Sequence, residues 1–226
     1  MGAQENPTVL NERLSIHTAA DAAAQWNELS SRHPELSKLL TGVQARLGLA
    51  DSAALDALSG GVVGYSTETI LSGNVPVPAE LAGTEKGTEV NKITATIVAK
   101  TYEGTGSEQV AACATVLRGH PSGEEIVDAF VLVGQKGSLV DTAEELVAGE
   151  AGTLVPRDGW WDALTRCLGG CGSTCLSAAI GCPKPSWQIF LVCLAGRCGL
   201  CVVKCAACAT CDCTWWCRIG VGCCNH

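Results

Sequence analysis

The placement of cysteine constrains this chain more than any other feature. The chain has 226 residues and 15 cysteines, and every cysteine except Cys113 lies between Cys167 and Cys224. Cysteine at this density is typical of a small domain that is cross-linked by disulfides or folded around metal ions, because such a domain buries too little surface to be stable otherwise. The sequence therefore predicts an ordinary domain over residues 1–150, a linker over 151–159 and a cysteine-rich tail over 160–226.

Charge divides the chain in the same way. The net charge is about +3 from Cys167 onward and about −11 before it, which together give the net −8 of the whole chain. A positive tail favours anionic surfaces, and an acidic domain can hold such a tail in cis. The alternative is that both charge excesses belong to ordinary solvated surfaces.

Residues 1–150 are expected to form an α+β domain. Apolar spacing and capping residues predict a helix over Ala19–Leu29 capped by Thr18, a second that starts near Pro34 and runs to Leu47, and a third that starts at Asp51 or Ser52 and ends at Gly60 and Gly61. The Gly-, Thr- and Pro-rich stretch over residues 64–90 is expected to be a loop. A final helical turn is expected over Thr142–Val147.

Three β-branched runs, separated by turn-rich segments, predict a three-stranded antiparallel meander over Lys92–Thr101, Gln109–Leu117 and Ile126–Val133. Cys113 lies inside the second run, where a single thiol is more often a small buried hydrophobe than a nucleophile. The chain has no phosphate loop, nucleophile elbow, zinc-protease motif or dinucleotide fingerprint. We therefore expect neither enzymatic activity nor a cofactor.

The cysteines of the tail recur at helical spacing. Cys167, Cys171, Cys175 and Cys182 form one stripe, and a second stripe runs from Cys198 to Cys211 in steps of three and four residues. A break at residues 181–185, which include two prolines, lets the stripes fold back as an all-α hairpin, with facing thiols within disulfide reach. The predicted disulfide cysteines are Cys167, Cys171, Cys175, Cys182, Cys193, Cys198, Cys201, Cys205, Cys208, Cys211, Cys213, Cys217, Cys223 and Cys224.

A metal-thiolate tail is the alternative interpretation. The pairs Cys198 and Cys201, Cys205 and Cys208, Cys208 and Cys211, and Cys211 and Cys213 have the spacing of zinc or iron–sulfur ligands. A helical stripe produces the same spacing automatically, however, and here the neighbours are apolar rather than turn-forming residues. We therefore expect disulfides and no bound metal.

The tail also has the composition of a membrane-active peptide. Its charges are nearly all basic, and five of the six tryptophans of the chain, Trp160 and Trp161 among them, lie in or beside it. Tryptophan prefers the membrane–water boundary and basic residues are attracted to anionic lipid, although the tryptophans of a small domain can equally pack in its core. The candidate membrane-contact residues are Trp187, Trp215, Trp216, Lys184, Arg197, Lys204 and Arg218.

The tail contains the pattern Cys167-Leu-Gly-Gly-Cys171-Gly-Ser-Thr-Cys175-Leu-Ser-Ala-Ala-Ile-Gly-Cys182, followed by Phe190-Leu-Val-Cys193-Leu-Ala-Gly-Arg-Cys198-Gly-Leu-Cys201. This pattern resembles the cysteine-rich halocin-like and fulvocin-related bacteriocins. The resemblance covers residues 160–226 and implies a small apolar helical peptide at the C-terminus of a longer precursor. In the halocin type the N-terminal segment serves as the immunity protein, which implies a masking or immunity role for residues 1–150. This tail has more cysteines than the family leads us to expect, and the N-terminus lacks the basic and apolar regions of a secretory signal.

The sequence thus predicts the precursor of a secreted antimicrobial peptide, exported by a non-standard route and matured by a transporter or protease. Its expected partners are the membrane or envelope of a target cell and, for the tail, the N-terminal domain in cis or in trans, with no nucleic acid. Two alternatives stay open. One is a cysteine-rich metal-binding or redox protein, and the other is a disulfide-rich surface or structural interaction protein.

Overall fold

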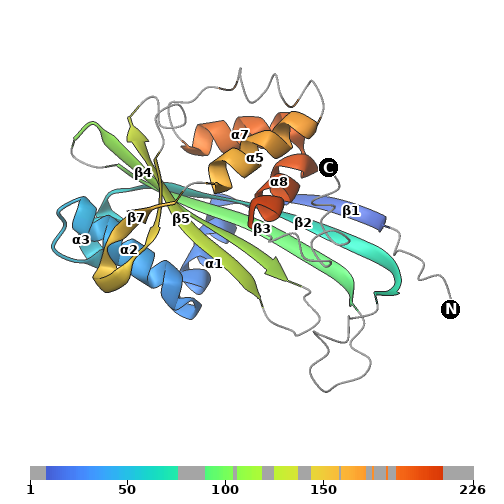
Figure 1. Cartoon of the computed structure of the whole chain (residues 1–226), viewed down its shortest axis with the longest axis horizontal. Helices are drawn as coiled ribbons and strands as arrows, with labels where there is room; N and C mark the ends of the chain where they lie inside the picture. Colours follow the sequence, from blue (N-terminus) through green and yellow to red (C-terminus); the bar gives the residue numbers. More distant parts are fainter. Residues whose placement is uncertain are drawn as a thin grey trace.

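The computed structural model of the chain has three layers, with a β-sheet between two layers of helices (Figure 1). It describes residues 9–75, 90–103, 106–118, 125–136, 144–157, 159–171, 175, 182 and 187–210. The strands are β1 (Val9–Ile16), β2 (Ser59–Val75), β3 (Val90–Glu103), β4 (Glu108–Arg118), β5 (Ile126–Gln135), β6 (Glu144–Ala148) and β7 (Leu154–Pro156). The helices are α1 (Ala19–Arg32), α2 (Pro34–Arg46), α3 (Ser52–Ala57), the short η1 (Glu150–Gly152), α5 (Trp160–Gly170), α7 (Trp187–Cys198) and α8 (Leu200–Thr210).

The three N-terminal helices confirm the sequence prediction. The Thr18 side chain accepts a hydrogen bond from the Asp21 amide and caps α1, Pro34 opens α2, and Asp51 caps α3 through the Ala54 amide at 2.8 Å. Two helix ends differ from the expectation, since α1 runs three residues past Leu29 to Arg32 and α3 ends before Gly60. Helix α3 stops at Ala57, because β2 begins at Ser59 and pairs there with Tyr102 of β3.

The sheet contains the predicted meander and is larger than it. Strands β3, β4 and β5 pair in unbroken antiparallel register, as expected from their β-branched runs. Among the described residues the sheet has seven strands in the order β1-β2-β3-β4-β5-β6-β7, with every neighbouring pair antiparallel. The prediction of an α+β fold is thus confirmed, with four strands more than the sequence indicated.

Strand β2 covers residues 64–75 of the predicted loop, so the prediction was wrong there, and residues 76–89 of that loop lie outside the described residues. Its glycines do not all mark turns. A Cβ on Gly64 would lie 3.3 Å from the Cβ of Ala22 in α1 and 3.5 Å from His17, so this glycine lets the helix approach the strand closely. Thr67 and Thr69, which also suggested a loop, are buried on one face of the strand.

The region after β5 was also predicted incorrectly. A helical turn was expected over Thr142–Val147, but Glu144–Ala148 form strand β6, because Leu146 packs into the core beside α2 and Glu145 points to the other face, where Arg157 binds it. Residues 142 and 143 lie outside the described residues. The segment predicted as an exposed linker contains η1 and β7, and β7 pairs with β6 from Leu154 to Pro156. The chain is therefore bound to the sheet as far as Arg157, whose amide donates to the Glu145 carbonyl.

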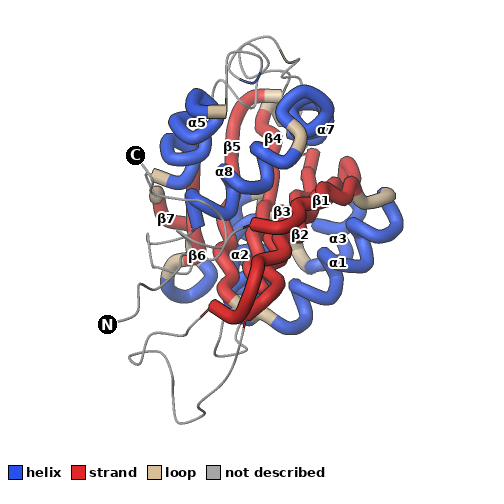
Figure 2. The backbone as a smooth tube through the Cα atoms, turned by 90° about the vertical axis from the view of Figure 1, so that its right-hand side faces the viewer, coloured by secondary structure: helices blue, strands red, loops and turns tan. Residues whose placement is uncertain are grey.

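Each face of the sheet carries its own apolar cluster. On one face α1, α2 and α3 bury Trp26, Leu36, Leu39, Val43 and Leu55 against alternate residues of β3, β4 and β5. On the other face α5, α7 and α8 of the tail pack on the remaining alternate residues. Figures 1 and 2 show the two helical layers on opposite sides of the strands. Cys113 is fully buried in β4 on the tail side, as predicted for a small hydrophobe.

Candidate functional site

The tail is built around a ladder of disulfides. Four pairs are present among the described residues, Cys167–Cys205, Cys171–Cys201, Cys175–Cys198 and Cys182–Cys193. Their Cα–Cα distances of 5.4, 6.2, 5.0 and 5.8 Å lie in the ordinary range for disulfides. The four pairs are nested, since Cys167 bonds to Cys205 on the outside and Cys182 to Cys193 on the inside. This is the pattern of two antiparallel segments and confirms the predicted disulfide-bonded hairpin.

The second stripe is two helices rather than one. Helix α7 ends at Cys198, and Gly199 has a φ of +54°, a left-handed conformation that glycine adopts without strain. The Gly199 amide donates to the Ala195 carbonyl at 2.9 Å and closes the helix end. Helix α8 then starts at Leu200 and lies beside α5 (Figure 2). Cys208 in α8 is also disulfide-bonded.

The apolar face of this hairpin is covered by the sheet. The buried tail residues come from all three helices and include Leu164, Leu168, Leu194, Val202 and Val203. They belong to one cluster with buried residues of the sheet, namely Tyr65, Ile93, Ala95, Ile97, Ala99, Ala111, Cys113, Leu117, Phe130 and Leu132. The tail and the N-terminal domain thus share a continuous apolar core in the intact chain.

Charged contacts hold the tail at two places. Lys204 of α8 forms an ion pair with Glu12 of β1. At the start of the tail, Arg157 donates to both carboxylate oxygens of Asp128 at 2.7 and 3.1 Å and to Glu145 at 2.5 Å. Its guanidinium also lies over the ring of Phe130, 5.4 Å from the ring centroid. Arg157 therefore fixes the chain to β5 and β6 just before α5 begins.

The structure locates only part of the predicted membrane-contact set. Arg197 is exposed in the last turn of α7, Trp187 is the first residue of that helix, and Lys204 is ion-paired to Glu12. Lys184, Trp215, Trp216 and Arg218 lie outside the described residues, as do Cys211, Cys213, Cys217, Cys223 and Cys224. Within the described part of the chain, the helices are too short or too polar to cross a membrane.

The cysteines with the spacing of metal ligands belong to different disulfides, which are called the rungs of the ladder below. Cys198 and Cys201, which have CxxC spacing, bond to different partners, Cys175 and Cys171. The closest sulfur group is a different one, formed by Cys167, Cys171 and Cys205, whose Sγ atoms all lie within 4.8 Å of one another.

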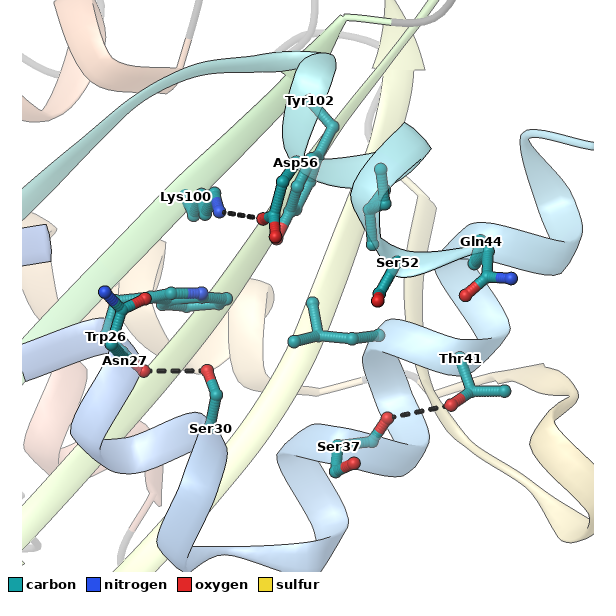
Figure 3. Close-up of a pocket in the computed structure, with 12 residues that line it drawn as sticks. Trp26, Asn27, Ser30, Ser37, Thr41, Gln44, Ser52, Asp56, Lys100 and Tyr102 are labelled. Carbon is teal, nitrogen blue, oxygen red and sulfur yellow. Dashed lines mark hydrogen bonds and ion pairs between the residues drawn. The ribbon is translucent and has the colours of Figure 1, made fainter. Parts of the chain in front are cut away.

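A second feature, a polar pocket between α1, α2, α3 and β3, was not found from the sequence (Figure 3). It has a volume of about 230 Å³. Lys100 lies at its edge with a side chain only 10% exposed, and its Nζ is 2.7 Å from Asp56 Oδ1 and 5.3 Å from the centroid of the Tyr102 ring. The other lining residues are Trp26, Asn27, Ser30, Ser37, Leu40, Thr41, Gln44, Ser52 and Leu55.

The pocket is charge-balanced and lies on the far side of the sheet from the tail. Burial, with a smaller effect of the Asp56 carboxylate, raises the pKa of Tyr102 well above its ordinary value, while a hydrogen bond to Trp26 acts in the opposite direction. The phenol is thus kept neutral, and the Lys100 ammonium is compensated by Asp56. The one sequence signal was Lys100 itself, a lysine inside an otherwise apolar and β-branched run.

Comparison of the chain with protein-family models, with curated proteins and with solved structures finds no match.

Proposed function

We propose that the chain is the precursor of a secreted, disulfide-bonded, membrane-active antimicrobial peptide. In this proposal the tail is the active peptide, and residues 1–157 are the segment that masks it. The single observation that carries the proposal is the burial of the apolar face of the tail against the sheet of the N-terminal domain.

The residues buried in this interface are those that a membrane-active helix would insert. Leu164 and Leu168 of α5 are each 1% exposed, as are Val202 and Val203 of α8. A helix that lies in the membrane interface needs an apolar face of this kind together with basic residues on its polar face. Arg166 and Arg197 are exposed in the intact chain, so the basic side is already outward while the apolar side is covered.

The disulfide ladder supports the proposal that the tail stays folded after it leaves the sheet. A helical segment of this size buries too little surface by itself to stay folded. Disulfides contribute about 2–4 kcal/mol each by restricting the unfolded chain. Four nested rungs would therefore keep the hairpin formed after the sheet is removed.

The ion pair between Lys204 and Glu12 supports masking in a second way. In the intact chain it occupies one of the basic residues that would otherwise attract anionic lipid. Release of the tail frees this lysine at the same time as the apolar face. Masking thus covers the apolar face and neutralises Lys204, and both would otherwise contribute to membrane binding.

The test uses the whole oxidised chain with a specific protease site placed between Arg157 and Trp160. The intact chain is expected to leave dye-loaded phosphatidylglycerol vesicles sealed and related bacteria alive. The cleaved and separated tail is expected to release the dye and kill the cells, and added residues 1–157 are expected to suppress both effects. An oxidised tail that is inert in both assays would refute the proposal.

A matched pair of variants tests the masking contact. Glu12→Gln removes the partner of Lys204 and should weaken suppression by residues 1–157. Glu68→Gln removes a surface carboxylate that pairs with Lys92 instead, and suppression should not change. Equal suppression by both variants would show that this ion pair has no part in masking.

A further inference from the structure

Two neighbouring rungs of the ladder bring four sulfur atoms into one group. Cys167 and Cys171 are four residues apart, and so are their partners Cys205 and Cys201 on α8. The Sγ of Cys171 lies 3.5 Å from the Sγ of Cys205, a cysteine of the other rung. Since the sulfurs of Cys167, Cys171 and Cys205 lie within 4.8 Å of one another and Cys201 is bonded to Cys171, the two disulfides form a single cluster.

The spacing of this cluster is close to that of a four-thiolate metal site. A tetrahedral site with Zn–S bonds of about 2.3 Å has sulfurs about 3.8 Å apart. The backbones of the two pairs are separated by 5.4 and 6.2 Å, so small side-chain rotations would open a central position once the S–S bonds are broken. Cys167 lies in α5, Cys171 directly follows it, and α5 lies beside α8, which carries Cys201 and Cys205 (Figure 2).

The surroundings also suit a thiolate site. Cys205 is fully buried and Cys167, Cys171 and Cys201 are half-buried, so the cluster is largely shielded from water. A donor set made only of sulfur selects soft or borderline ions such as Zn²⁺.

We propose that the reduced chain binds one zinc ion through Cys167, Cys171, Cys201 and Cys205. Each of the two disulfides takes two electrons and two protons from a dithiol reductant, which itself becomes a disulfide. The four thiols then lose four protons as they bind Zn²⁺. The site goes beyond the antimicrobial proposal and is independent of it, because it belongs to the reduced chain and membrane activity was assigned to the oxidised tail.

In this proposal the hairpin of the tail can be cross-linked either by disulfides or by a zinc ion. In an oxidising environment the rungs are covalent, and in a reducing environment zinc would join the same four positions. Metal binding of this kind stabilises the folded form only, so it couples to folding of the tail.

The experiment uses the full chain reduced with a water-soluble phosphine, which carries out the same two-electron reduction with water as the source of oxygen. Co²⁺ is the probe, because tetrahedral thiolate coordination gives it intense visible and near-ultraviolet bands. We expect one Co²⁺ per chain, displaced by one Zn²⁺, with a gain in helical circular dichroism. The oxidised chain is expected to give no such bands.

Two double variants locate the site. Cys171→Ser with Cys205→Ser removes a cysteine from each rung of the cluster and should lower zinc affinity by at least about 100-fold, since even groups that only orient metal ligands contribute about 10–100-fold. Cys182→Ser with Cys193→Ser removes the same number of thiols at the far end of the ladder and should bind zinc like the unmodified chain. Equal affinity of the two variants, or no binding by the reduced chain, would overturn the proposal. The vesicle assay on the oxidised tail would be unaffected by either result.

Discussion

Arg157 has the largest set of charged contacts at the start of the tail. It neutralises Asp128 and Glu145, whose side chains are only 21% and 5% exposed. Without Arg157, both carboxylates lose this compensating charge while water still has little access to them. We expect Arg157→Ala to lower the free energy of unfolding by about 1–3 kcal/mol, because charged groups that lose a partner in such a site pay the cost of desolvation. Denaturant unfolding of the oxidised chain measures this change.

Lys136→Ala is the matched control for Arg157. Lys136 pairs with Glu103 at 2.9 Å, but both side chains are about half exposed, at 54% and 47%. An exposed pair of this kind contributes no more than about 1 kcal/mol. If the two variants were equally stable, Arg157 would have no special role in fixing the tail.

Glu125 gives the fold a pH dependence whose direction can be stated. Burial acts to raise the pKa of Glu125, but Arg118, Arg32 and His33 together hold it below the ordinary value of 4.5. A carboxyl with a lowered pKa in the folded state stabilises the fold above the pKa of the unfolded chain, and this stability is lost as the pH falls through the folded pKa.

Glu125→Gln should therefore lower the free energy of unfolding by about 1–3 kcal/mol at pH 7, as expected for hydrogen bonds to charged groups. The difference from the unmodified chain should shrink as the pH falls below 4.5. Urea unfolding at pH 7 and pH 3 tests this, with the exposed Glu103→Gln as the control. A difference that grew at low pH would contradict the assignment.

At the scale of elements, patterns were reliable wherever local chemistry determines the structure. Thr18, Pro34 and Asp51 marked the starts of α1, α2 and α3, because a helix start depends on residues close in sequence. The spacing of the tail cysteines indicated which stripes face each other, because bonded stripes must present thiols at helical steps.

The missed elements depend on distant partners. Strand β2 has glycines and threonines that are typical of loops, yet it pairs with β3 from Ser59 to Ile70 and with β1 on its other side. The polar pocket was missed for the same reason, because Lys100, Asp56 and Trp26 come from different elements and meet only in the folded chain. β-propensity is set largely by such tertiary neighbours, so the sequence alone could not reveal them.

The contact between α2 and β7 leads to a prediction at this scale. A Cβ on Gly42 would lie 2.6 Å from Cδ2 of Leu154 and 3.2 Å from the carbonyl oxygen of Gly152. Gly42→Ala should therefore force α2 and β7 apart and lower the free energy of unfolding by about 1–3 kcal/mol.

Gly196→Ala is the matched control in another helix. The new Cβ would have no atom within 4 Å beyond its own helix turn, so the substitution should be neutral or stabilise the chain by up to about 1 kcal/mol through helix propensity. Thermal unfolding of both variants tests the contrast. A neutral Gly42→Ala would show that α2 and β7 are not packed as closely as described.

For the whole molecule, the two tyrosines report separately on the two faces of the sheet. Tyr65 is buried in the cluster shared with the tail, and this burial raises its pKa to about 12 from the ordinary 10.0. Tyr102 lies on the opposite face. Release of the tail should expose Tyr65 and lower its pKa towards 10 without changing the environment of Tyr102.

Absorbance titration at alkaline pH, with Tyr102→Phe to isolate Tyr65, measures this shift in the intact and cleaved chains. We expect almost no ionisation of Tyr65 at pH 10 in the intact chain and about half ionisation after removal of the tail. Tyr65→Phe serves as the control, since Tyr102 should titrate alike in both samples. An unchanged Tyr65 pKa after release would mean that the tail does not cover this face.

The order of the strands has a consequence for how the tail cysteines find their partners. The sheet runs β1 to β7 in the order of the chain, so a ribosome completes all seven strands before it reaches the first tail cysteine, Cys167. If the sheet folds as it is synthesised, the nascent helices meet a finished apolar surface. Even the eight cysteines of the four described disulfides can pair in 105 ways, and a template that orients α5, α7 and α8 as they emerge would favour the nested pairing over the others. The N-terminal domain would thus act first as a folding template that selects the nested disulfide pairing of the tail.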